Sequence, residues 1–154
     1  MRRILLVLSA VFMTACLNSN EPTAHPSDPA TETFDSTLGI SISQMQKTSD
    51  GVYYTDVTTG TGDSLTSAQT VTVDYAGYLK TGLLFDQGTG AQFSLSGVIV
   101  GFAEGMLATP YMRVGGRRKI VIPSALAYGT SPPPGSGIPA NATLVFDITL
   151  KSIP

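Results

Sequence analysis

Val73-Asp74-Tyr75-Ala76-Gly77 forms the centre of a stretch, residues 70–79, in which apolar and polar side chains alternate. A period of two is typical of a β-strand with one buried face. Shorter aromatic segments follow along the chain: Phe85-Asp86, Ala127-Tyr128-Gly129 and Ala142-Thr143-Leu144-Val145-Phe146-Asp147. They supply rings, aliphatic groups, a phenol and a carboxylate that we expect to be buried, without a nucleophile, a general base or a set of metal ligands. The segments therefore indicate a site that binds an apolar group rather than one that hydrolyses a bond.

The rest of the sequence predicts more strands and one short helix. Strands are expected at residues 52–57, 92–95, 117–122 and 143–151. The last strand alternates, with four side chains predicted to face inward: Leu144, Phe146, Ile148 and Leu150. A helix is expected from Gly101 to about Ala108, because Pro110 keeps the residue before it out of the helical region. This pattern predicts the α+β class, about five antiparallel strands with a helix on the concave face and a hollow for an apolar ligand.

In this order the motifs resemble the FKBP-type peptidyl-prolyl isomerase family, over roughly residues 51–154. The resemblance implies a five- to six-stranded antiparallel half-barrel sheet wrapped around one short helix. It also implies isomerisation of prolyl bonds with no covalent step, no cofactor and no metal ion. By their positions in the family motifs, the implied catalytic residues are Tyr75, Asp86 and Tyr128. The implied substrate-binding residues are Phe85, Phe93, Val98, Ile99, Phe102, Ile138 and Phe146.

The resemblance also implies a role for individual groups. The Tyr128 hydroxyl donates to the substrate, the Ile99 backbone N–H meets a bound carbonyl, and Ile138 lies at the rim. Taken singly, these residues have ordinary explanations, since an inward Tyr75 or Phe146 would be a core aromatic in any β domain. Asp86 could equally satisfy a turn amide. Their recurrence in family order favours the binding site.

Two departures from the family pattern concern the floor of the expected pocket. Phe102 stands where the family usually has Trp, and the chain contains no Trp. A smaller ring is expected to enlarge the floor and change the fit of a ligand. The link at residues 106–112 is about three residues longer than usual in the family, which affects the length of the helix.

The N-terminal residues resemble a bacterial lipoprotein signal. Arg2 and Arg3 precede a short apolar stretch, too short to span a membrane, that ends at Cys16, the single cysteine. We expect residues 1–15 to be a signal peptide, with lipidation of Cys16; the alternative is an ordinary secretory signal with an incidental cysteine. Residues 16–40, poor in large apolar side chains, are expected to form a flexible tether. Residues 41–154 are expected to form the isomerase domain.

Composition narrows the classes of function. Removing Arg2 and Arg3 with the signal takes the net charge from −2 to about −4, which argues against a nucleic-acid-binding protein. His25, the only histidine, lies in the expected tether, so no histidine serves acid–base chemistry inside the domain. A basic cluster is interpreted as a solvated strand edge rather than an anion site; it comprises Arg113, Arg117, Arg118 and Lys119.

The sequence thus predicts a monomeric, lipid-anchored isomerase of the cell envelope that acts on proline-containing polypeptides. The resemblance adds the macrolide ligands of the family as binding partners. The alternative is a non-catalytic module of the same fold that holds client proteins, and a third interpretation is a purely structural envelope lipoprotein.

Overall fold

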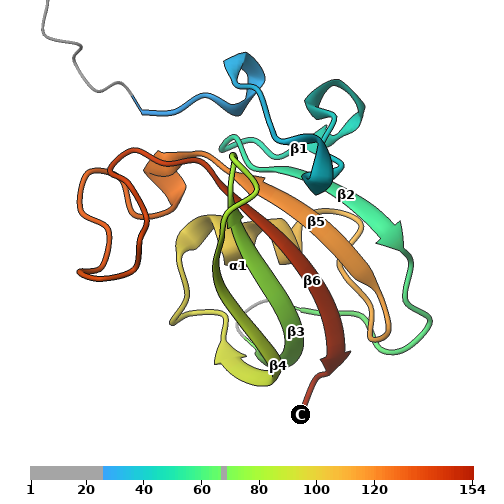
Figure 1. Cartoon of the computed structure of the whole chain (residues 1–154). Helices are drawn as coiled ribbons and strands as arrows, with labels where there is room; N and C mark the ends of the chain where they lie inside the picture. The colour runs from blue at the N-terminus through green and yellow to red at the C-terminus, as the bar shows by residue number, and fades with distance from the viewer. Residues whose placement is uncertain (1–25, 67–68) are drawn as a thin grey trace, which may run out of the picture.

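The structure is a computed structural model that describes residues 26–66 and 69–154. Its main element is a six-stranded antiparallel sheet in the order β1-β2-β5-β6-β3-β4 (Figure 1). The strands are β1 (Gln46–Lys47), β2 (Tyr53–Thr58), β3 (Thr70–Leu79), β4 (Leu84–Ser94), β5 (Arg117–Ile122) and β6 (Leu144–Ser152). The predicted α+β class and number of strands are confirmed. The expected signal peptide, Cys16 and His25 lie outside the described residues.

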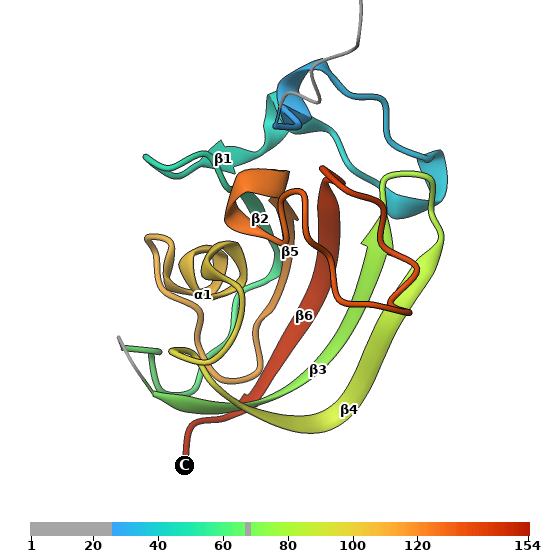
Figure 2. The ribbon, with the colours of Figure 1, turned by 90° about the vertical axis from the view of Figure 1, so that its left-hand side faces the viewer.

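The helix α1 (Val100–Leu107) lies on the concave side of the sheet, and the strands curve around it (Figure 2). Two glycines on one face of the helix permit this close packing. A Cβ atom at Gly101 would lie 2.2 Å from Ile122, and one at Gly105 would lie 2.5 Å from Ile120. The helix therefore rests directly on β5, within one residue of its predicted bounds. No helix in the described residues is long and apolar enough to cross a membrane.

The main core fills the space between α1 and the sheet. The β6 residues predicted to face inward, Leu144, Phe146, Ile148 and Leu150, are all buried there. Val145 also proves to be buried, although alternation predicts an outward position. It belongs to a second cluster on the opposite face of the sheet, together with Leu38, Tyr53 and Val121. Both faces of the sheet are therefore covered at this end of β6.

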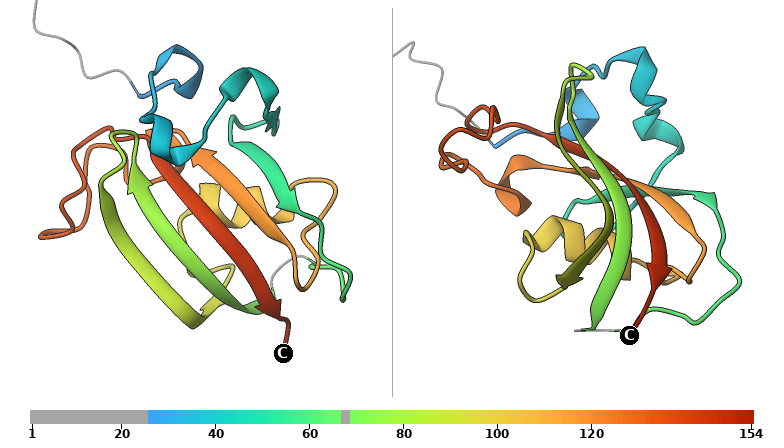
Figure 3. Two further views of the ribbon diagram at one scale, coloured as in Figure 1. Left: turned by 45° about the vertical axis from the view of Figure 1, so that its right-hand side comes forward. Right: turned by 60° about the horizontal axis from the view of Figure 1, so that its bottom comes forward.

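Most of the covering segment comes from the expected tether. Three 3-10 turns, η1 (Pro29–Thr31), η2 (Ser36–Leu38) and η3 (Ile42–Gln44), lie across one end of the sheet (Figure 3, left). Residues 16–40 are predicted to be flexible, whereas Phe34, Leu38 and Ile40 pack against the sheet. The same packing continues with Ile42 and Met45, so the predicted boundary at residue 41 falls inside one packed segment. The segment packs because its few apolar side chains, Phe34, Leu38 and Ile40, contact an apolar patch on the sheet. This patch consists of Tyr53, Val121 and Val145.

Two strands differ from their predictions. β4 is continuous from Leu84 to Ser94, whereas the sequence predicts a strand only at residues 92–95, because glycines weaken the pattern before them. β5 is an interior strand, so its basic residues do not protect an edge. Arg118 is 1% exposed and forms a bidentate pair with Asp56, at 2.7 and 3.0 Å. The interpretation of this cluster as a solvated edge is therefore wrong.

Arg118 instead fastens the long link that follows α1. Its guanidinium donates to the carbonyl oxygens of Gly105, Ala108 and Pro110, at 2.9, 3.1 and 2.6 Å. It also lies over the ring of Tyr54, whose hydroxyl donates to the carbonyl of Thr109. A planar group with five N–H donors can satisfy several carbonyls at once. The lengthened link is thus held by a buried cation.

Candidate functional site

A cavity of about 320 Å³ opens between α1 and the concave side of β3, β4 and β6. It brings together nine of the ten predicted catalytic and substrate-binding residues. Its lining consists of Tyr75, Phe85, Asp86, Phe93, Gly97, Val98, Ile99, Phe102, Tyr128 and Phe146. These residues come from three strands, the loop between β4 and α1, the first turn of α1 and the loop after β5, so only the folded chain assembles them.

Five aromatic rings form a continuous wall around this cavity. Phe102 lies at its centre, with its ring centroid 5.2 Å from Phe146 and 6.2 Å from Phe93. Phe146 meets Phe85 at 5.6 Å, and Phe93 meets Tyr75 at 5.4 Å. All four pairs are edge-to-face, which is a favourable arrangement for ring quadrupoles. Each ring therefore fixes the orientation of the next.

Tyr75 and Asp86 join two neighbouring strands at the mouth of the cavity. The Tyr75 hydroxyl donates to Asp86 Oδ2 at 2.8 Å, while Oδ1 accepts the backbone N–H of Gln87 at 2.9 Å. Burial and this carboxylate raise the pKa of Tyr75 to about 12, so its phenol stays protonated at neutral pH. Asp86 itself is exposed, not buried as expected, because β4 is the edge strand of the sheet.

Tyr128 enters the cavity from a loop that follows the short turn η4 (Ser124–Leu126). The backbone N–H groups of Ala127 and Gly129, on either side of it, both donate to the carbonyl of Ser124. Gly129 adopts a left-handed φ of 52°, which suits glycine at this tight reversal. The hydroxyl of Tyr128 is therefore presented by a hydrogen-bonded turn.

Ile99 occupies the N-cap position of α1, where backbone N–H groups lack helical partners. Its carbonyl accepts the backbone N–H of Phe102 at 3.0 Å. Among the described residues, no hydrogen bond occupies the backbone N–H of Ile99. Ile99 lines the cavity, so this N–H is a candidate donor to a carbonyl of a bound chain.

Ile138 is the predicted site residue that does not line the cavity. It is buried in the main core, and its backbone N–H donates to the hydroxyl of Ser136. Its side chain thus supports the loop of residues 127–143 from within. The family motif gives its place in the sequence but not the course of this loop.

Sequence reasoning missed the glycines that make room for the rings. A Cβ atom at Gly77 would lie 2.7 Å from Phe85 and 2.8 Å from Phe146. One at Gly88 would lie 2.7 Å from the ring of Tyr75. Glycines inside strands mark close approach, so their positions in β3 and β4 carried the signal. Gly97, also missed, lines the cavity directly.

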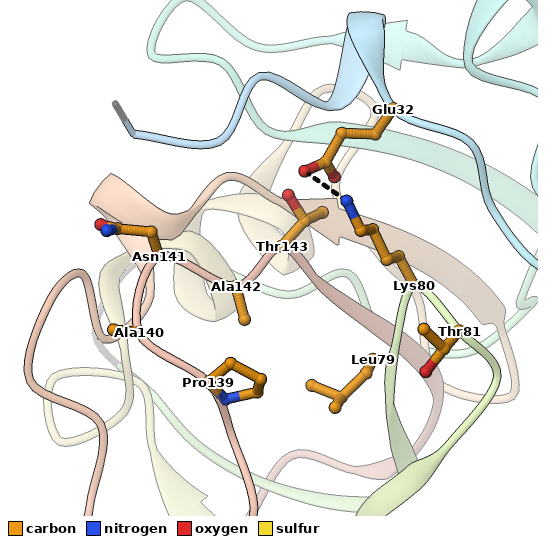
Figure 4. A pocket seen from close by; sticks show the side chains of 9 residues that line it. All are labelled: Glu32, Leu79, Lys80, Thr81, Pro139, Ala140, Asn141, Ala142 and Thr143. Carbon is orange, nitrogen blue, oxygen red and sulfur yellow. Dashed lines mark hydrogen bonds and ion pairs between the residues drawn. The ribbon is translucent and has the colours of Figure 1, made fainter. Parts of the chain in front are cut away.

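A second cavity of about 220 Å³ lies beside the loop of residues 139–143 (Figure 4). It is lined by Glu32, Leu79, Lys80, Thr81 and residues 139–143. None of the predicted site residues and no aromatic ring takes part in it. The aromatic cavity is therefore the candidate active site.

Comparison with known proteins agrees with this geometry. Residues 62–151 match the family model described as FKBP-type peptidyl-prolyl cis-trans isomerase. FkpA of Buchnera aphidicola, an FKBP-type peptidyl-prolyl cis-trans isomerase, is 42% identical over 113 residues, which cover 71% of this chain and 45% of that protein. FK506-binding protein 4 of Dictyostelium discoideum is 42% identical over 106 residues, covering 66% of this chain and 28% of that protein.

The fold comparison points the same way. The crystal structure of a peptidyl-prolyl cis-trans isomerase from Pseudomonas syringae pv. tomato superimposes with a TM-score of 0.64 at 34% identity, covering 71% of this chain and 80% of that one. The chain spans less than half the length of the two curated relatives named above. The family match, in contrast, extends over most of the sheet, α1 and the aromatic cavity. The chain therefore belongs to the FKBP-type peptidyl-prolyl cis-trans isomerase family.

Proposed function

We propose that this protein catalyses cis–trans isomerisation of X-Pro bonds in polypeptides (EC 5.2.1.8), using the aromatic cavity as the site. The observation that carries the proposal is the continuous row of five rings that lines the cavity, together with the phenol of Tyr128 and the free N-cap amide of the lining residue Ile99. Such a cavity suits a proline ring in size and polarity. It contains no group placed for covalent chemistry.

The rate enhancement would come from differential binding of the twisted amide. Rotation about the amide C–N bond costs roughly 18–20 kcal/mol, because twisting removes the resonance of the planar form. The carbonyl of the twisted amide is less polar than that of the planar amide. Transfer from water to an apolar cavity therefore costs the twisted transition state less free energy than the planar ground state. Every ~1.4 kcal/mol gained by the transition state over the ground state is a factor of ten in rate.

Separate residues would serve distinct parts of the substrate. The rings of Tyr75, Phe85, Phe93, Phe102 and Phe146 would enclose the proline. Tyr128 would donate from its hydroxyl to one substrate carbonyl, and Ile99 would donate from its backbone N–H to another. Asp86, held by Tyr75, would fix the edge strand beside the bound chain. Val98 would add apolar contact at the same edge.

The rival function is a binding module that holds clients without turnover. Phe102 in place of the usual Trp favours this alternative, because a wider floor makes fewer contacts with the proline ring.

A refolding assay limited by prolyl isomerisation separates the two functions. It uses the chain that lacks residues 1–15 and carries Cys16→Ser. Catalysis predicts acceleration that falls at least tenfold in Tyr128→Phe and in Asp86→Val, whereas the exposed control Tyr111→Phe retains it. Binding of a proline peptide without acceleration would support the module, and absence of both would leave only the structural interpretation.

The clients and the location belong to the same proposal. Proline-containing polypeptides outside the cytoplasm are the proposed substrates, since uncatalysed prolyl isomerisation takes tens of seconds. The name of the Dictyostelium relative supports macrolides such as FK506 as ligands of the aromatic cavity.

The domain would be held at a bacterial membrane by its N-terminal residues. Residues 1–15 would serve as the signal peptide, Cys16 would be acylated, and residues 16–25 would form the remaining tether. Metabolic labelling with a fatty acid tests this, and Cys16→Ser should abolish the label.

A further inference from the structure

Residues 27–38, called here the strap, run from the turn that carries Tyr128 to the turn that leads into β4. At the first end, Ser27 and Ser124 exchange two hydrogen bonds. The backbone N–H of Ser27 donates to Ser124 Oγ at 3.0 Å, and the backbone N–H of Ser124 donates to Ser27 Oγ at 2.8 Å. Ser124 is only 1% exposed and Ser27 is half-buried, so this pairing is partly shielded from water.

Ser124 is also the acceptor that holds the turn of Tyr128. Its carbonyl takes the backbone N–H of Ala127 at 3.1 Å and that of Gly129 at 2.8 Å. The residues on both sides of Tyr128 are thus fastened to Ser124, and Ser124 is fastened to Ser27. Loss of the hydrogen bonds between Ser27 and Ser124 would therefore loosen the backbone turn that carries Tyr128.

The other end of the strap grips the turn between β3 and β4. The backbone N–H of Asp35 donates to the carbonyl of Lys80 at 2.8 Å, and Lys80 pairs with Glu32 at 3.2 Å (Figure 4). The side chains of Asp35 and Thr37 pack on Gly82, where a Cβ atom would lie 3.2 Å from each of them. This turn leads directly into Leu84, Phe85 and Asp86 of β4.

Between its ends the strap is fixed to the domain. Pro29 and Leu38 are buried, and Lys119 of β5 donates to the carbonyl of Leu38. Asp28 and Asp35 cap the turns η1 and η2, which gives the segment a defined shape. One continuous and well-anchored segment therefore joins the loop that carries Tyr128 to the loop between β3 and β4, which leads into the cavity residues Phe85 and Asp86.

We propose that the strap sets the distance between these two loops, and that Ser27 is a positioning residue for Tyr128. Its effect on catalysis rests on the proposed isomerase function, while its effect on the Tyr128 turn does not. Neither Ser27 nor Asp35 lines the aromatic cavity. Any change that they cause at Tyr128 or Asp86 must therefore travel through the backbone of the two turns.

Amide hydrogen exchange, followed by NMR, tests the first end in the chain that lacks residues 1–15 and carries Cys16→Ser. In Ser27→Ala, exchange of the Ala127 and Gly129 amides should become about two- to tenfold faster, the effect expected of one lost hydrogen bond. Exchange in the interior strands, at Ile120 and Phe146, should not change. Ser27→Thr, which keeps the hydroxyl, should restore the slow exchange, and the exposed control Ser36→Ala should resemble the wild type.

Asp35→Pro tests the second end, because the φ of −59° at this position suits proline but the donor to Lys80 is lost. We expect faster exchange of the Gly82 amide, again with the interior strands unchanged.

In the refolding assay, Ser27→Ala should lower kcat with little change in KM, since the rings that bind proline stay in place. Unchanged exchange at Ala127 and Gly129 in Ser27→Ala would overturn the inference. An inactive wild type would instead overturn the proposed function and leave the exchange result valid.

Discussion

Tyr75 and Asp86 lie on adjacent strands, and a hydrogen bond of 2.8 Å joins their side chains in the lining of the aromatic cavity. The phenol is partly buried, and its partner carries a negative charge. Burial first, and then the bond to Asp86, disfavour ionisation and raise the pKa of Tyr75 to about 12. The edge strand β4 is thus tied to β3 by a group that remains a donor throughout the neutral range.

The first prediction concerns stability at high pH. Because folding raises the pKa of Tyr75 from its ordinary value of about 10, the stabilisation is complete below pH 10 and is lost as the pH rises through about 12. The free energy of unfolding of the wild type should therefore fall more steeply between about pH 10 and 12 than that of Tyr75→Phe. Urea unfolding across this range measures the difference. Tyr111→Phe, at an exposed position, should follow the wild type, and parallel curves for wild type and Tyr75→Phe would contradict the assignment.

The second prediction uses the absence of tryptophan. Phe102 is 4% exposed and touches Phe93 and Phe146, so Phe102→Trp should place a single indole at the floor of the cavity. Its emission should be blue-shifted and should change when a proline-containing peptide binds. We expect KM to change more than kcat, because the floor sets the fit of the ring. An emission maximum typical of a water-exposed indole, or no change in emission on adding the peptide, would show that the floor lies elsewhere.

The sequence predicted the elements that have a strict local period. Residues 70–79 and 117–122 form strands with the predicted bounds, and the inward side of β6 follows from simple alternation. The residues of the aromatic cavity could be selected because their motifs recur in family order. Their local patterns alone could not have assembled them, since the rings come from strands that are distant along the chain.

What the sequence did not predict depends on contacts between distant segments. Arg118 and Arg117 are neighbours with the same side chain, yet one is buried in the core and the other is exposed on the outer face. Neighbours in a strand face opposite sides, and here α1 and the link after it cover only the side of Arg118. Leu38 and Val145 are likewise buried because the segment that carries Leu38 covers the face of the sheet on which Val145 lies. Ile138 is assigned to the rim by its motif, but the course of its loop buries the side chain in the core.

The third prediction compares these two arginines. Arg118→Ala removes the partner of Asp56 and of three carbonyls in the link after α1, so we expect a loss of about 3–5 kcal/mol in the free energy of unfolding. Arg118→Lys should recover only part of it, because an ammonium cannot reproduce the planar fork. Arg117→Ala breaks a surface pair with Asp147 and should cost about 1 kcal/mol or less. Equal losses in the two alanine variants, measured in urea, would contradict the role given to Arg118.

The fourth prediction concerns the glycine under the rings. Gly77 leaves room for Phe85 and Phe146, whose edge-to-face contact forms one wall of the cavity. In Gly77→Ala the new methyl group would meet both rings at less than 3 Å, so at least one ring must move. We expect a cost of about 1–3 kcal/mol in stability. Affinity for a proline peptide should fall about tenfold or more, because the displaced ring enters the cavity.

Gly97→Ala is the matched control for this prediction, since Gly97 also lines the cavity. A Cβ atom there would have Ser94 O as its nearest contact, at 3.5 Å, which is an ordinary packing distance. Its stability should therefore stay within about 0.5 kcal/mol of the wild type. If Gly77→Ala bound the peptide as tightly as Gly97→Ala does, the wall formed by Phe85 and Phe146 would not be the surface that proline contacts. The aromatic cavity would then have a function other than binding a proline ring.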